Sequence, residues 1–118
     1  MEPPCSEKAT VVLLNYGRPW NLQLIVDRLL KTNFVERIVI SNNCVDYPMA
    51  KFVETDDPRV ILRDEEKNLG VAVRYAIAAQ YSSAYFLTID DDIFFSPEQV
   101  WRLFRAVVDD PDCLHGVQ

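Results

Sequence analysis

The sequence predicts an α/β domain of three layers, with helices on both faces of a mostly parallel, twisted sheet. Short apolar runs rich in β-branched residues alternate with segments whose apolar residues recur at helical spacing, which is the pattern of successive βαβ units. The first of these runs, residues 10–14, is continuously apolar rather than alternating, as expected of a strand buried on both faces. The 118 residues, of which 49% are hydrophobic, suit one domain with its own core. We therefore expect a single domain over residues 1–118.

The first βα unit is predicted near the N-terminus. Residues 10–14 (TVVLL) form a short apolar run, and a polar loop containing Gly17 ends it. A helix is expected to follow, beginning at Pro19 or Trp20 and ending at about residue 31. Five apolar residues at helical spacing mark its buried stripe: Leu22, Ile25, Val26, Leu29 and Leu30.

Two further strands and a helix are predicted in the middle of the chain. The second strand covers residues 35–40, and a third, shorter one covers residues 60–62. An alanine-rich helix is expected over residues 71–81, after the turn residue Gly70. These elements continue the strand–helix alternation that predicts parallel strands.

A fourth strand and a third helix are predicted near the C-terminal end of the sequence. Residues 84–89 (AYFLTI) predict a fourth strand that leads directly into three aspartates. Ser96 caps the next helix, and Gln99 completes a capping box, so we expect a helix to about residue 108. Residues 114–117 are predicted to begin a fifth strand.

The segments that follow the four strands are polar. In open α/β sheets, ligands bind beyond the carboxyl ends of the strands. We therefore expect one ligand-binding rim made of residues 15–18, 41–44, 63–70 and 90–92.

Three consecutive aspartates are the most informative feature of this rim. In an extended segment, residues i and i+2 point to the same side, so Asp90 and Asp92 are expected to share a face with Asp91 turned away. Hard carboxylate oxygens suit Mg²⁺ or Mn²⁺, which commonly bind substrate phosphates as well. The alternative is a solvated acidic loop, which the position directly after a buried strand disfavours.

Composition excludes several other classes. The net charge is -6, with 18 acidic against 12 basic residues, so a nucleic-acid partner is not expected. Three widely spaced cysteines without a CxxC motif argue against a disulfide framework or a zinc site. Neither a signal peptide nor an apolar run of about 20 residues is visible, and we expect a cytoplasmic protein.

Three segments in the same order resemble GT-A glycosyltransferases, both family-2-like enzymes and exostosin-type domains. The segment FLTIDDDIFFSPEQV of this chain, a strand followed by acids, resembles the family's DXD region. The segment VVLLNYGRPWNLQLIVDRLL resembles the family's first strand, loop and helix. The segment ILRDEEKNLGVAVRYAIA resembles its Asn-x-Gly segment with an arginine in the following helix. The likeness runs from about residue 10 to residue 117. It implies a GT-A-type fold and transfer of a sugar from a nucleotide-diphosphate donor, with a UDP-sugar favoured, to a carbohydrate or glycoconjugate acceptor.

The resemblance also implies roles for individual residues. Asp92 matches the family's ligand to the Mn²⁺ or Mg²⁺ ion on the diphosphate, and Asp90 matches the acid that contacts the ribose or the metal shell. Where many family-2 enzymes carry an acid after the second strand, this chain has Asn42 and Asn43, as exostosin-type domains do. The other residues implied to border the nucleotide are Asn15, Arg18, Asn68 and Arg74.

The length of the chain and its Asp-x-Asp motif leave two other functions open. Related enzymes usually continue for about as many residues again, with the acceptor site and, in inverting members, the catalytic base. The resemblance therefore predicts a donor-binding half without that base, and a non-catalytic nucleotide-sugar-binding module is the alternative function. A phosphatase-like or phosphotransfer site is a third reading, because an Asp-x-Asp also follows a strand in haloacid-dehalogenase-type enzymes. There the motif is Asp-x-Asp-x-Thr after the first strand, whereas here it follows the fourth strand and Phe94 takes the place of the threonine.

Overall fold

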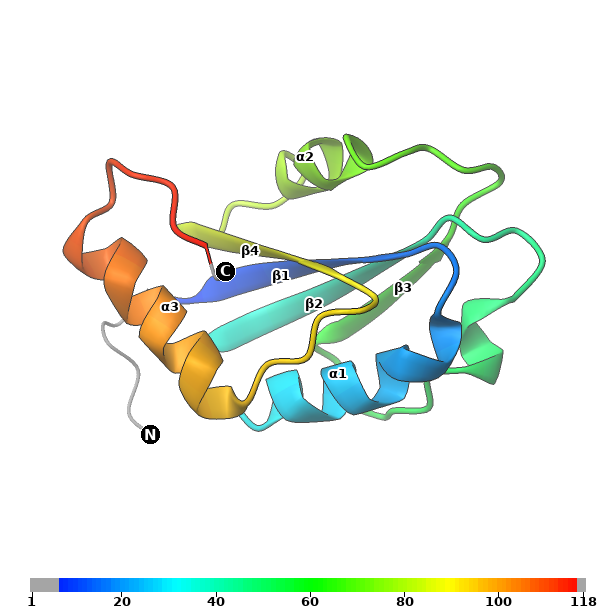
Figure 1. Cartoon of the computed structure of the whole chain (residues 1–118), viewed down its shortest axis with the longest axis horizontal. Helices are drawn as coiled ribbons and strands as arrows, with labels where there is room; N and C mark the ends of the chain where they lie inside the picture. The colour runs from blue at the N-terminus through cyan, green and yellow to red at the C-terminus, as the bar shows by residue number, and fades with distance from the viewer. Residues whose placement is uncertain (1–6, 117–118) are drawn as a thin grey trace.

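The computed structural model describes residues 7–116, and its elements form one α/β sandwich (Figure 1). The four strands are β1 (Ala9–Asn15), β2 (Val35–Asn42), β3 (Val60–Asp64) and β4 (Tyr85–Asp90). The α-helices are α1 (Leu22–Leu30), α2 (Val73–Ala78) and α3 (Pro97–Asp109), with short 3₁₀ turns η1 (Pro19–Asn21) and η2 (Met49–Lys51). The strands are arranged in the order β3-β2-β1-β4, and every neighbouring pair is parallel.

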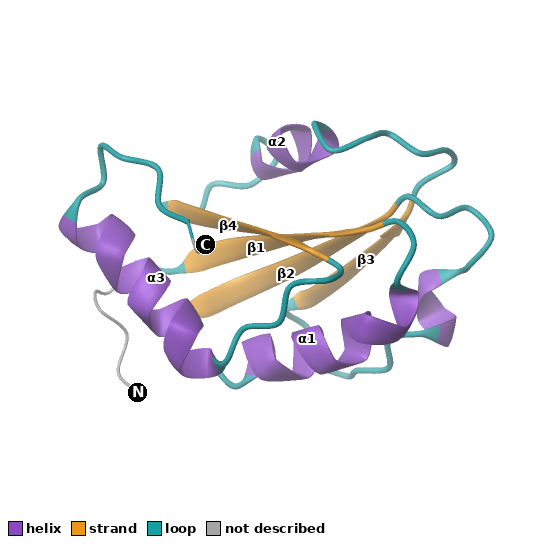
Figure 2. Ribbon diagram, viewed as in Figure 1, coloured by secondary structure: helices purple, strands orange, loops and turns teal. Residues whose placement is uncertain are grey.

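The sheet is covered on both faces, which confirms the predicted three layers (Figure 2). Helices α1 and α3 lie on one face and α2 lies on the other. Successive β1 side chains alternate between the two cores: Val11 and Leu13 pack with α1 and α3, whereas Val12 and Leu14 pack with α2. Because β1 is buried on both faces, it has the continuous apolar sequence from which a parallel strand was predicted.

The strand order creates a switch point beside β1. From β1 the chain adds β2 and then β3 on one side, and it returns through α2 to place β4 on the other side of β1. Parallel strands end at the same edge of the sheet, so β1 and β4 end side by side. Crevices of this kind, where the order reverses, are the usual ligand sites of open α/β sheets.

The four predicted strands and three predicted helices are all present, with shifted ends. β2 and β3 run two residues further than predicted because Asn42 still pairs with Asp64 in the ladder. Helix α2 is shorter than the predicted residues 71–81. The turn η2 was not predicted.

The predicted fifth strand is wrong for residues 114–116, which lie in no strand. Leu114 is fully exposed and therefore has no sheet or helix face to pack against. Val117 lies outside the described residues.

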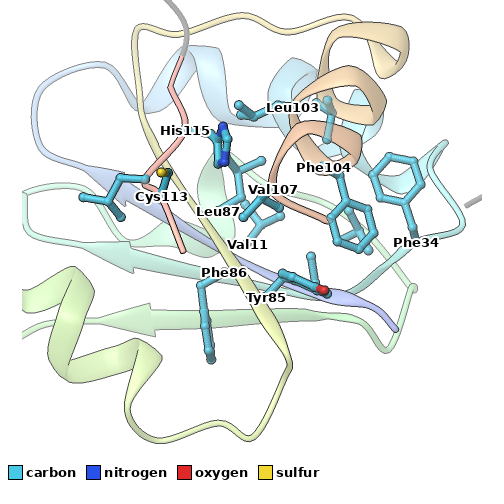
Figure 3. A pocket seen from close by; sticks show the side chains of 14 residues that line it. Val11, Phe34, Tyr85, Phe86, Leu87, Leu103, Phe104, Val107, Cys113 and His115 are labelled. Atoms are coloured by element: carbon cyan, nitrogen blue, oxygen red, sulfur yellow. The ribbon is translucent and has the colours of Figure 1, made fainter. Parts of the chain in front are cut away.

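Helix α3 is anchored at its start and along its buried side. The predicted capping box is present: Ser96 Oγ accepts from the Gln99 N–H, and the Gln99 side chain accepts from the Ser96 N–H. Phe104 packs against Phe34 and Tyr85, with ring centroids 5.2 and 5.1 Å apart. Figure 3 shows these rings in the cavity between α3 and the sheet.

Two sequence expectations concern the rest of the chain. Cys44 and Cys113 are free thiols, as expected from the spacing, and Cys5 lies outside the described residues. Among residues 7–116, no helix has the length and apolar character needed to cross a bilayer.

Candidate functional site

A cleft of about 320 Å³ opens at the carboxyl ends of β1 and β4. All four predicted rim segments contribute to it, although residues 63–70 do so only through Asn68 and Gly70 at the end far from β3. The cleft is lined by Leu14, Asn15, Tyr16, Arg18, Asn43, Asn68, Gly70, Val71, Asp90, Asp91 and Asp92.

A single buried carboxylate joins the ends of β1 and β4. Asp91 is 6% exposed, and its Oδ2 accepts hydrogen bonds from the backbone N–H groups of Tyr16, Gly17 and Arg18 at 3.0, 3.2 and 3.1 Å. Its backbone carbonyl accepts a fourth bond from the Asn21 side chain at 2.8 Å. Three consecutive N–H dipoles aimed at one oxygen form an anion-binding concavity, which offsets the desolvation of the buried charge.

The three aspartates do not continue the strand. β4 ends at Asp90, and a turn follows in which the Ile93 N–H donates to the Asp90 carbonyl at 3.2 Å. The expectation of an extended segment through Asp92 is therefore wrong, because the Asp91 bonds to the β1 loop draw the chain into a turn. Asp91 nevertheless differs from its neighbours as expected, since the Asp91 side chain is 9% exposed and those of Asp90 and Asp92 are 50% and 47% exposed.

The two exposed aspartates each face an arginine. Arg74 Nη2 donates to Asp90 Oδ1 at 2.8 Å, and Arg18 Nη1 lies 3.4 Å from Asp92 Oδ2. In each carboxylate the arginine contacts one oxygen only. The pairs therefore place two positive and two negative charges around the mouth of the cleft.

A chain of hydrogen bonds fixes the orientation of Asn15 at the floor of the cleft. The Asn42 amide nitrogen donates to the Tyr47 carbonyl and to Asp64 Oδ1, so Asn42 Oδ1 must be the acceptor for the Asn15 amide nitrogen, 2.8 Å away. Asn15 Oδ1 is then the remaining acceptor, and it is buried with no hydrogen-bond donor among the described residues. Unsatisfied buried acceptors are uncommon and costly, so this oxygen indicates a ligand donor or water.

Two more asparagines shape the far wall. Asn43 Oδ1 accepts from the Leu69 N–H at 3.0 Å, which holds the segment after β3 against the end of β2. Asn68 Oδ1 accepts from the Gly70 N–H at 2.9 Å, and Gly70 has a φ of +76°, a conformation that disfavours side chains. This turn presents Asn68 to the cleft.

The structure brings most of the predicted site residues together. Five of the seven predicted nucleotide-contacting residues and the second metal ligand line the cleft: Asn15, Arg18, Asn43, Asn68 and Asp90, with Asp92. Arg74 reaches the site through Asp90. Asn42 does not line the cleft, because its amide bonds are directed at Asn15, Tyr47, Asp64 and the Cys44 N–H.

The acidic residues of the cleft suit a metal ion that is held partly by the protein and partly by a substrate. Within residues 7–116, no three histidine, cysteine or acidic side chains are grouped so as to hold an ion alone. Mg²⁺ and Mn²⁺ are often held by one or two carboxylates, with substrate phosphates and water completing the shell. Asp90 and Asp92, each with an oxygen not used by its arginine, fit that pattern.

Comparison with known proteins gives one family. The sequence model of glycosyl transferase family 2 matches residues 10–117, which includes every residue of the cleft. No curated protein matches the chain significantly.

The buried position of Asp91 predicts a loss of stability on substitution. Asp91→Asn keeps the size of the side chain but removes the charge that three N–H groups face, so we expect the free energy of unfolding to fall by about 1–3 kcal/mol. Asp92→Asn is the matched control at an exposed neighbour and should change stability by less than about 0.5 kcal/mol. Urea denaturation followed by circular dichroism measures both, and equal stabilities for the two variants would show that the Asp91 bonds do not hold the loop.

Proposed function

The chain belongs to glycosyl transferase family 2, and on that basis we propose that its cleft binds a nucleotide-diphosphate sugar through a divalent cation. We propose UDP as the nucleotide and a carbohydrate or glycoconjugate as the acceptor of the sugar. The observation that carries the proposal is the cleft itself, which gathers acids, an arginine and asparagines at the β1–β4 switch point.

The charges around the cleft support a diphosphate. Asp90 and Asp92 would hold Mg²⁺ or Mn²⁺ through their oxygens, and the bound ion would neutralise negative charge on the leaving diphosphate. Arg18 lines the cleft with its side chain 54% exposed, so its guanidinium can turn toward phosphate oxygens without leaving a buried position. The chain's own net charge is negative, which makes these local cations necessary for holding an anion.

The floor of the cleft supports a base with an N–H group. Asn15 Oδ1 is fixed as an acceptor and has no hydrogen-bond donor within the described residues 7–116. The uracil ring carries an imide N–H, which would satisfy this oxygen. Cytosine has an acceptor at the same ring position and would offer an N–H only from its neighbouring amino group, with the ring shifted. The asparagine orientation therefore favours uridine over cytidine nucleotides.

The first test concerns the metal ligand. Asp92→Asn removes a charged oxygen ligand but keeps shape and volume, so the metal-dependent affinity for UDP should fall roughly 10- to 150-fold, from the loss of about 1.5–3 kcal/mol. Calorimetric titration of UDP with Mn²⁺ and with chelator measures the change. Asp109→Asn is the control, because Asp109 is also exposed and paired with an arginine, on α3. If Asp92→Asn binds UDP as wild type does under both conditions, the metal assignment is wrong.

The second test concerns the base. With Mn²⁺ present, UDP should bind on the order of tenfold more tightly than CDP, since CDP would set an acceptor against a buried acceptor. Asn15→Ala removes the discriminating oxygen and should bring the two affinities together. Equal affinities for UDP and CDP in the wild-type protein would contradict the assigned role of Asn15.

A further inference from the structure

Arg74 is held far more firmly than the other arginine of the site. Its side chain is 17% exposed, against 54% for Arg18. Its Nε donates to the Val71 carbonyl at 3.0 Å, and its Nη2 donates to Asp90 Oδ1 at 2.8 Å. Its Nη1 has no hydrogen-bond acceptor within residues 7–116. The guanidinium is therefore fixed beside Asp90 with one nitrogen still available to an anion.

This arrangement makes Arg74 a competitor of a cation at Asp90. Without ligand, the Arg74 guanidinium neutralises the Asp90 carboxylate. A divalent ion that binds Asp90 must share or break this pair, and it also meets the repulsion of a fixed positive charge. Binding of the ion alone is therefore opposed by the protein's own counter-ion.

A diphosphate would remove that opposition. Its oxygens are acceptors that a guanidinium binds well, so Arg74 gains a new partner when the nucleotide enters. Asp90 is then released to the cation. The same arginine thus weakens the binding of the ion by itself and strengthens the binding of the ion with the nucleotide.

We propose that Arg74 is a positioning residue that exchanges Asp90 for the diphosphate, and so couples metal binding to nucleotide binding. This inference rests on the proposed function. The coupling is the factor by which Mn²⁺ raises the affinity for UDP, and by linkage UDP raises the affinity for Mn²⁺ by the same factor. A fixed cation that merely repelled Mn²⁺ and attracted UDP would shift both affinities but leave that factor unchanged, since pairwise interactions add.

The test is the substitution Arg74→Met, which keeps the aliphatic stem and removes the charge. Mn²⁺ alone, titrated by electron paramagnetic resonance of the free ion, should bind about three- to tenfold more tightly than to wild type, given the strength of partly buried ion pairs. The coupling factor, from calorimetry of UDP with chelator and with saturating Mn²⁺, should fall by about the same ratio. Association of Mn²⁺ with UDP in solution is common to all variants and cancels.

Two matched variants keep the test decisive. Arg74→Lys retains the charge and should keep Mn²⁺ affinity near the wild-type value, which separates charge from folding if Arg74→Met proves unstable. Arg102→Met removes an exposed arginine paired with Glu98 on α3 and should alter neither quantity. If wild type binds Mn²⁺ and UDP but Arg74→Met leaves the coupling factor unchanged, the exchange is overturned and the proposed function stands. If wild type binds neither ligand, both are overturned.

Discussion

The geometry of the site depends on the buried carboxylate of Asp91. It accepts three N–H bonds from the loop after β1 and so ties together strand ends that are more than 70 residues apart in the chain. The same bonds set the turn after β4, in which Asp90 and Asp92 are exposed to the cleft. They also fix the backbone of Arg18, from which that side chain extends. If the Asp91 bonds were lost, the Arg18–Asp92 pair would have no defined position.

A second polar layer supports this one beneath the β1–β2–β3 side of the cleft. Asn15, Asn42 and Asp64 are joined by hydrogen bonds across three strand ends, at positions where the ladder pairs Asn15 with Asn42 and Asn42 with Asp64. Buried polar groups are tolerated when fully bonded and costly otherwise. In this layer one atom, Asn15 Oδ1, has no hydrogen-bond partner among residues 7–116, and Asn15 is one of the residues that line the cleft. Folded proteins leave such energetically unfavourable features mainly at functional sites. The unpaired oxygen of Asn15, a residue of the cleft, is consistent with that tendency.

The fold could be predicted from the sequence because burial leaves a local signal. The continuous apolar run of β1, the apolar stripe of α1 around Ile25 and the Ser96 capping box can each be recognised from a short stretch of sequence. For the site, the sequence predicted only which segments lie together, because the loops that follow parallel strands meet at one edge of the sheet. The role of Asp91 and the Asn15–Asn42–Asp64 chain was missed, because these contacts join residues that periodicity cannot relate. The arginine partners of Asp90 and Asp92 were missed for the same reason, although Arg18 and Arg74 themselves were expected near the nucleotide.

The central claim is that a divalent ion and a nucleotide diphosphate meet in the cleft between β1 and β4. The most direct test is the amide NMR spectrum of ¹⁵N-labelled protein with UDP, compared with Mg²⁺ and then with paramagnetic Mn²⁺. The account predicts that Mn²⁺ broadens the amide signals of Tyr16–Arg18 and Asp90–Asp92 first, followed by those of Asn68–Val71, while signals from the far end of the sheet near Val35 and Tyr85 persist. Broadening centred elsewhere on the molecule, or none with UDP and Mn²⁺ at millimolar concentration, would contradict it.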